Sequence, residues 1–140
     1  MQRKSSAVWK GGLKDGSGTV STGSGALSNA PYSFASRFEK GGQTDPEELI
    51  AAAHAGCFSM ALSGQLGAAN LKADSVATTA SVTLEKTDAG FTVTAVHLSV
   101  RARVPGADKA AFETAANNAK SGCPISRLLN AKITMEVVLE

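Results

Sequence analysis

Residues 45–62 read DPEELIAAAHAGCFSMAL and predict the long helix around which the rest of the chain is arranged. Asp45 is a good N-cap, Pro46 suits the first helical position, and Glu48 lies where a capping box places its second acidic partner. The following residues are apolar on most sides, which predicts a buried core helix that extends to about Ala69. We expect its packed face to consist of Ile50, Ala53, Cys57, Met60, Ala61 and Gly64.

The segment before this helix predicts β-structure with glycine-rich turns. Residues 6–12 (SAVWKGG) and 18–27 (GTVSTGSGAL) are strand candidates, and the turn signal LKDGSG lies between them. Residues 31–38 (PYSFASRF) predict a third short strand, with Tyr32 and Phe34 on one face. The next residues, 39–44 (EKGGQT), predict a flexible loop.

The segment after the helix predicts a long hairpin, two further helices and a last strand. Residues 75–86 and 91–104 alternate in polarity on either side of the turn TDAG. Asp108 caps a helix that Gly122 closes, Pro124 opens a short helix, and residues 132–140 form the final strand. Strands and helices segregate in this order, which predicts one α+β domain over residues 1–140 with mainly antiparallel sheets.

The composition limits the classes of partner. The chain carries 14 Lys and Arg against 12 Asp and Glu, and no long basic run, which argues against a nucleic-acid or membrane-surface partner. The N-terminal segment MQRKSSAVWKGG has no apolar stretch typical of a signal peptide, and the apolar run over residues 49–62 is short for a membrane span. We therefore expect a soluble cytoplasmic protein, and a core poor in aromatic residues that dimerisation supplements.

The two cysteines, Cys57 and Cys123, are the strongest chemical candidates. A permanent disulfide is not expected in a cytoplasmic chain, which leaves two buried thiols or a reversible redox pair. On an apolar helix face, Cys57 behaves as a small hydrophobe unless a cation such as Arg37 stabilises its thiolate. Cys123 falls at the N-cap of the short helix, where free N–H groups and the helix dipole favour a thiolate.

The remaining titratable residues have weaker signals. His54 neighbours Cys57 on the helix and is either a base or a packed histidine with one hydrogen bond. Glu48 has a capping role, which leaves Glu47 freer for chemistry. His97 alternates with apolar neighbours and is expected on the surface. The spacing H-x-x-C occurs once with no C-x-x-C beside it, so we expect no metal site.

Three motifs carry a resemblance to a known family. RFE (residues 37–39), DPEELIAAAHAGCFSMAL and SGCPIS (residues 121–126) resemble the osmotically inducible protein C (OsmC) and organic hydroperoxide resistance (Ohr) family. GTVSTGSGAL, PYSF, TDAGF and VPG fit the OsmC branch. The resemblance implies an intertwined α+β homodimer with mainly antiparallel sheets on a long buried central helix. It also implies sites at the subunit interface and no metal or flavin cofactor.

The resemblance further implies a thiol-dependent peroxidase of the stress response that reduces organic hydroperoxides to alcohols. Cys57 would be the peroxidatic thiol and Cys123 the resolving thiol, with Arg37 and Glu47 activating Cys57. A dithiol such as a lipoylated protein would be the reductant. The alternatives are a general thiol–disulfide oxidoreductase and a non-enzymatic ligand-binding stress protein.

Helix geometry adds a constraint on this site. Glu47 and Cys57 on one straight helix lie about 15 Å apart along its axis, which is too far for contact. We therefore expect the site to borrow Arg37 or Glu47 from a second chain. The apolar side chains near Cys57 predict a pocket for bulky organic peroxides, with Ile50, Phe58 and Met60 as its lining and with Glu48 and His54 as supporting residues.

Overall fold

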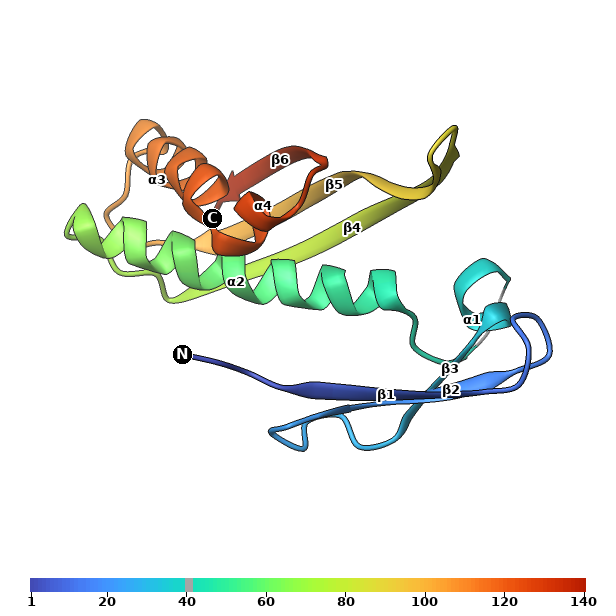
Figure 1. Ribbon diagram of the computed structural model, residues 1–140. Coiled ribbons are helices and arrows are strands. Elements are labelled where there is room, and N and C mark those ends of the chain that lie inside the picture. Colours follow the sequence, from blue (N-terminus) through green and yellow to red (C-terminus); the bar gives the residue numbers. More distant parts are fainter. Residues whose placement is uncertain (40–41) are drawn as a thin grey trace. The chain divides into compact units, whose positions relative to one another are not determined.

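The computed structural model describes residues 1–39 and 42–140, which form two compact units, 1–49 and 50–140. Lys40 and Gly41, in the middle of the predicted loop, lie outside the described residues. Each unit contains one three-stranded sheet, and helix α2 begins in the first unit and continues through the second (Figure 1). The α+β class predicted from the sequence is confirmed, whereas a single domain over residues 1–140 stays a prediction.

The first unit is an antiparallel sheet in the order β1-β2-β3. Strand β1 (Ser5–Lys10) pairs with β2 (Ser17–Thr22) from Ser5 opposite Thr22 to Lys10 opposite Ser17. Strand β3 (Ala30–Ser33) pairs with the other edge of β2. Both strands predicted before residue 30 are therefore present.

The third predicted strand is half wrong, because the chain turns into a helix at Phe34. Helix α1 (Phe34–Phe38) is capped by Ser33, whose hydroxyl oxygen accepts a hydrogen bond from the backbone N–H of Ser36. The Ser36 hydroxyl in turn accepts from the N–H of Ser33 at 2.9 Å. This reciprocal cap overrides the strand signal of the aromatic residues, and it separates Phe34 from the strand that holds Tyr32.

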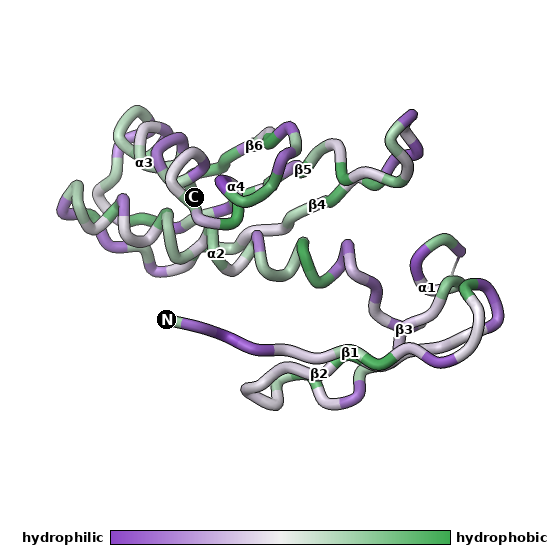
Figure 2. The backbone as a smooth tube through the Cα atoms, in the orientation of Figure 1, coloured by the Kyte–Doolittle hydropathy of each residue, from purple (hydrophilic) through white to green (hydrophobic). Residues whose placement is uncertain are grey.

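Helix α2 (Pro46–Ala68) begins where the sequence predicts it. The Asp45 carboxylate accepts a hydrogen bond from the N–H of Glu48 at 2.8 Å. The Glu48 carboxylate accepts from the Thr44 hydroxyl instead of reaching back to the cap. Figure 2 shows hydrophilic residues in the first turn of α2 followed by strongly hydrophobic ones, the pattern that predicted the helix.

The predicted packed face of α2 is partly wrong. Cys57 and Ala61 of that face are half-buried and pack against the core, and Ile50 is half-buried. The helix buries four residues spaced four apart, and Ala53, Met60 and Gly64 of the predicted face are exposed. Met60 is 78% exposed, so α2 is buried along one stripe within the chain and not on most sides. By length and composition alone α2 is long and apolar enough to span a membrane, so the shortness of its apolar run does not exclude a span. The buried stripe consists of His54, Phe58, Leu62 and Leu66.

The second unit contains a sheet in the order β4-β5-β6. Strands β4 (Ser75–Thr87) and β5 (Gly90–Arg103) form the predicted antiparallel hairpin, and Gly90 closes its turn with a φ of +106°. Strand β6 (Lys132–Leu139) pairs with β5 in parallel. Because β5 is central, its inward residues Val96, Leu98 and Val100 are buried, and their neighbours on β4 and β6 are half-buried.

Two helices connect β5 to β6. Helix α3 (Lys109–Gly122) is capped by Asp108, whose carboxylate accepts from the N–H of Ala111 at 2.8 Å, as predicted. Helix α4 (Pro124–Leu128) follows directly, with Cys123 as both the C-cap of α3 and the N-cap of α4. The core between sheet and helices contains Phe58, Leu62 and Leu66 of α2, Phe112 and three alanines of α3, and Cys123.

Candidate redox site

The second unit brings its two cysteines together. Cys57 lies on α2 and Cys123 at the junction of α3 and α4, and their sulfur atoms are 2.9 Å apart, in hydrogen-bond contact between two free thiols. Cys57 is half-buried, whereas Cys123 is fully buried. The predicted pairing of these two residues in space is therefore present, and Cys57 is the thiol that a solute reaches first.

The surroundings of Cys57 within the second unit favour the neutral thiol. Burial raises the pKa of Cys57, and the hydrogen bond with Cys123 raises it further. A backbone hydrogen bond from Ile125, at the start of α4, lowers the pKa in the opposite direction. Formation of a reactive thiolate at neutral pH therefore requires a further positive charge near Cys57.

His54 lies one turn before Cys57 and is fully buried. Its Nε2 is 2.8 Å from the Ser126 hydroxyl of α4, and its Nδ1 has no hydrogen-bond partner among residues 1–39 and 42–140. Burial lowers the pKa of His54, so the ring is neutral at neutral pH. Of the two interpretations of this residue, the packed histidine with one hydrogen bond is the one the structure shows.

The first unit contains the predicted Arg37–Glu47 pair. Arg37 is the fourth residue of α1, and Glu47 is the second residue of α2. The guanidinium donates two hydrogen bonds to the carboxylate, from Nε at 3.0 Å and from Nη2 at 2.7 Å. The hydrogen bond with Glu47 is the main cause that raises the pKa of Arg37, so this cation is permanent.

Ser36 connects α1, which carries Arg37, to the segment just before α2, which carries Glu47. Its hydroxyl donates to the backbone carbonyl of Thr44 at 2.9 Å, just before α2 begins. The same hydroxyl belongs to the cap of α1. The S-x-x-S spacing of Ser33 and Ser36 indicates this cap. The cap was not predicted because the neighbouring aromatic residues favour a strand.

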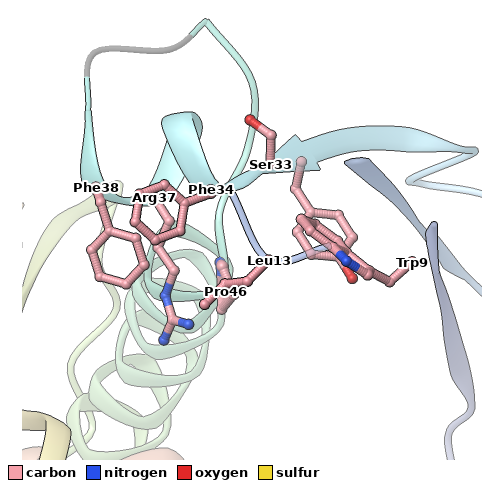
Figure 3. A pocket seen from close by; sticks show the side chains of 8 residues that line it. Trp9, Leu13, Ser33, Phe34, Arg37, Phe38 and Pro46 are labelled. Atoms are coloured by element: carbon pink, nitrogen blue, oxygen red, sulfur yellow. The ribbon is translucent and has the colours of Figure 1, made fainter. Parts of the chain in front are cut away.

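An apolar pocket of about 290 Å³ adjoins Arg37 in the first unit (Figure 3). The Trp9 and Tyr32 rings form one wall with centroids 5.3 Å apart, and Phe34 and Phe38 form another at 4.7 Å. The Arg37 guanidinium lies 5.2 Å from the centre of the Phe38 ring. The remaining lining residues are Leu13, Ser33 and Pro46.

This pocket differs from the one predicted around Cys57. Phe58 is fully buried in the core and Met60 is largely exposed, and the pocket lining predicted around Cys57 stays a prediction. Ile50 is half-buried on α2. The aromatic lining of the first unit was missed because its residues come from β1, β3 and α1, which no local pattern links.

His97 and Glu48, the remaining titratable candidates, form hydrogen bonds with residues other than the two cysteines. His97 is on the surface, as predicted, where its Nδ1 lies 2.8 Å from the Thr134 hydroxyl. Glu48 interacts with the N-terminal end of α2 and not with either thiol. Across residues 1–39 and 42–140, no three His, Cys, Asp or Glu side chains gather as a metal site. Ser126 was missed, because its role depends on a partner that is distant in sequence.

An α+β fold whose helices bring two free thiols to hydrogen-bond distance defines a dithiol protein. The chain belongs to the OsmC-like protein family, whose sequence model matches residues 39–138. It is 49% identical over its full length to peroxiredoxin OsmC of Escherichia coli K12, and covers 98% of that relative. It is also 32% identical over 100 residues to an organic hydroperoxide resistance protein of Xanthomonas axonopodis pv. citri, covering 71% of this chain and 68% of the relative.

Solved structures agree with the fold. A Legionella pneumophila organic hydroperoxide resistance protein OsmC superposes with a TM-score of 0.70 at 26% identity, over 96% of both chains. An OsmC-like protein of unknown function from Vibrio cholerae superposes with a TM-score of 0.78 at 18% identity, over 99% of both chains. The latter similarity concerns the fold alone.

Proposed function

We propose that this protein is a soluble, cytoplasmic, thiol-dependent peroxidase of the stress response that reduces organic hydroperoxides to alcohols. The observation that carries the proposal is the 2.9 Å contact between the free thiols of Cys57 and Cys123. The names of the relatives, a peroxiredoxin and an organic hydroperoxide resistance protein, support the same chemistry. Two thiols at this distance require little movement to form a disulfide.

In the first step the Cys57 thiolate attacks the distal oxygen of the hydroperoxide. The S–O bond forms as the O–O bond breaks, and the alkoxide takes a proton and leaves as the alcohol. Cys57 is thereby oxidised to a sulfenic acid. We assign the attack to Cys57 because it is half-buried, whereas Cys123 is fully buried and unreachable for a bulky peroxide.

In the second step the Cys123 sulfur, as thiolate, attacks the sulfur of the sulfenic acid. The S–S bond forms as the S–O bond breaks, and hydroxide leaves with a proton as water. An external dithiol, such as a lipoylated protein, then reduces the Cys57–Cys123 disulfide by two exchange steps and becomes a disulfide itself. Neither step requires a metal or an organic cofactor.

Arg37, held by Glu47, supplies the positive charge that the Cys57 thiolate needs. Glu47 holds the Arg37 guanidinium by two hydrogen bonds, and the guanidinium stabilises the thiolate. Glu47 and Cys57 occupy the same helix about 15 Å apart along its axis, so the pair of one chain acts on Cys57 of a second chain. The active form is then a homodimer. The exposed apolar face of α2, with Ala52, Ala53 and Met60, supports this assembly.

The apolar pocket beside Arg37 holds the organic part of the substrate. Its aromatic rings favour a bulky apolar group over hydrogen peroxide, which has no apolar surface to bury. The position of Arg37 at this pocket brings the peroxide group close to the cation that activates the thiolate. The lining by Ile50, Phe58 and Met60 that the sequence predicts is a separate proposal and stays untested.

A thiol count with intact mass tests the peroxidase chemistry. Fully reduced protein receives one equivalent of cumene hydroperoxide and is then denatured and treated with a thiol-blocking reagent. Loss of both thiols and a mass decrease of about two hydrogens is the expected result. Two free thiols with unconsumed peroxide would refute the proposal. Consumption of disulfide substrates without peroxide would instead identify a general thiol–disulfide oxidoreductase.

A further inference from the structure

Helix α4 has little to hold it in place by itself. It contains five residues, buries none of them fully, and has no side-chain hydrogen bond at its N-cap. A helix of this length has no intrinsic stability in water. Its position therefore depends on contacts with the rest of the second unit.

Contacts of Ile125 and Ser126 fix α4 against α2, and one of them is the backbone hydrogen bond from Ile125 to Cys57. Ile125 packs half-buried against the core, and Ser126 forms the 2.8 Å hydrogen bond with His54. Ser126 is three residues after Cys123, and His54 is three residues before Cys57. The hydrogen bond thus lies beside the thiol contact and joins the same two helices.

We propose that His54, through its hydrogen bond to Ser126, is a positioning residue that holds Cys123 at the distance needed to form a disulfide with Cys57. The inference rests on the proposed function for its role in the peroxidase cycle. The geometric part of the inference is that the His54–Ser126 bond sets the distance between the two sulfur atoms. This part does not depend on the oxidant.

The burial of His54 supports this role. A fully buried imidazole with an unpaired Nδ1 costs free energy, which a leucine in the same core would not. The cost is smallest when the proton is on Nε2, because the unpaired Nδ1 is then an acceptor and not a donor. In this tautomer Nε2–H donates to the Ser126 hydroxyl. A glutamine at position 54 carries an N–H donor at a similar reach.

The size of the effect is limited, because α3 also holds Cys123. The N–H of Cys123 donates to the carbonyl of Ala119 at 2.8 Å, at the end of α3. Without the His54–Ser126 bond the two sulfur atoms are therefore held close together for less of the time, while α3 still holds Cys123. We expect a change of about three- to tenfold, which corresponds to one hydrogen bond of a part-buried pair.

The first measurement is the equilibrium between dithiol and disulfide in a glutathione buffer, which needs no peroxide. His54→Leu and Ser126→Ala are each expected to lower the effective concentration of Cys123 at Cys57 about three- to tenfold. His54→Gln is expected to retain the wild-type value. The double variant is expected to lose no more than either single variant, because both changes remove the same bond.

Ser59→Ala is the matched control. The Ser59 hydroxyl of α2 donates to the Thr78 hydroxyl of β4 at 2.8 Å, so its removal deletes an equally short bond from the same helix to a different neighbour. We expect the wild-type disulfide equilibrium in this variant. An equal loss in Ser59→Ala and Ser126→Ala would overturn the proposal, since any weakening of α2 would then suffice. If His54→Leu fails to fold, Ser126→Ala alone carries the test.

The second measurement is the fate of Cys57 under increasing cumene hydroperoxide. Slow attack by Cys123 leaves time for a second peroxide to oxidise the sulfenic acid to a sulfinic acid with release of a second alcohol. The ratio of sulfinic acid to disulfide is expected to rise about three- to tenfold in Ser126→Ala and to stay unchanged in Ser59→Ala. An equal slowing of the first oxidation and of disulfide formation would contradict a positioning role for His54. A wild type that consumes no peroxide would refute the proposed function, while the glutathione equilibrium still decides the positioning.

Discussion

The Arg37 guanidinium and the Glu47 carboxylate form a bidentate ion pair, with hydrogen bonds of 3.0 and 2.7 Å. Arg37 lies on α1 and Glu47 in the first turn of α2, and the Ser36–Thr44 hydrogen bond connects the two segments. The Glu47 side chain is 14% exposed, so solvent screens this pair less than a pair on the open surface. The geometry orients a fixed positive charge beside an apolar pocket.

The two cysteines are expected to differ in their effect on turnover. Cys57→Ser should abolish peroxide consumption, because no thiol then forms the sulfenic acid. Cys123→Ser should allow one turnover and then stall with Cys57 oxidised. Consumption of cumene hydroperoxide in excess over enzyme, followed by intact mass, distinguishes the two variants. If the two phenotypes are exchanged, the roles of the cysteines are reversed.

Removal of the Arg37 charge should raise the pKa of the Cys57 thiol. Burial already raises this pKa, and an opposite charge near a thiolate lowers it by about one unit or more. In a Cys123→Ser background, Arg37→Ala should therefore need a higher pH to form thiolate, and its rate at neutral pH should fall about tenfold. The ultraviolet absorbance of the thiolate during a pH titration measures the shift.

Arg37→Lys is the matched variant for this titration. It keeps the charge but loses the fork that binds Glu47 twice, so we expect a pKa between those of the wild type and Arg37→Ala. An unchanged thiolate titration in Arg37→Ala would show that Arg37 has no influence on Cys57.

Mixed dimers test whether the ion pair of one chain serves Cys57 of another. Cys57→Ser alone is expected to be inactive, and Arg37→Ala alone to retain about a tenth of the wild-type rate. After equal mixing and subunit exchange, about a quarter of the wild-type sites should be intact, because each mixed dimer unites one normal Cys57 with one normal Arg37 from the other chain. No recovery after demonstrated exchange, or full activity in a monomeric form, would contradict a shared site.

Gly18→Ala should reshape the apolar pocket. A Cβ at Gly18 would lie 2.5 Å from a ring carbon of Tyr32 and 2.7 Å from the backbone oxygen of Val8, so both the Tyr32 ring and strand β1 at Val8 must shift. Because Tyr32 lines the pocket, we expect KM for cumene hydroperoxide to rise several-fold and KM for tert-butyl hydroperoxide to rise less. Gly42→Ala is the control, because the space around its Cβ position is open and Gly42 does not line the pocket.

Acidification should destabilise the fold through His54. Burial lowers its folded pKa below the ordinary value of about 6.5, so between these two values the unfolded chain binds a proton that the folded chain does not. The contribution of neutral His54 to the free energy of unfolding is therefore fully present above about pH 6.5. This contribution is lost as the pH decreases below that value. His54→Gln should lose less stability over this range.

Urea unfolding at neutral and mildly acidic pH measures this difference. His97, the other histidine, remains in both proteins, so the comparison isolates the contribution of His54. Equal losses of stability in the wild type and His54→Gln would show that His54 does not titrate between the folded and unfolded states.

Local signals predicted the elements that depend on neighbouring residues. The D-P-E-E start of α2, the hairpin of β4 and β5, and the Asp108 cap of α3 are all present, because caps, turns and alternation act over a few residues. The α1 helix was missed where two local signals competed, and the Ser33–Ser36 cap prevailed over the strand preference of the aromatic residues.

The sequence by itself determined the α+β class, the helix that bears Cys57 and the position of Cys123 before a proline. Only the tertiary structure decided that the buried stripe of α2 contains His54 and Phe58, because the helix is apolar on most sides and the sheet selects the face. It also decided that Cys57 meets Cys123 and that His54 meets Ser126. These contacts join residues far apart in the chain, and the packing of α2 against the sheet and α4 sets their distance.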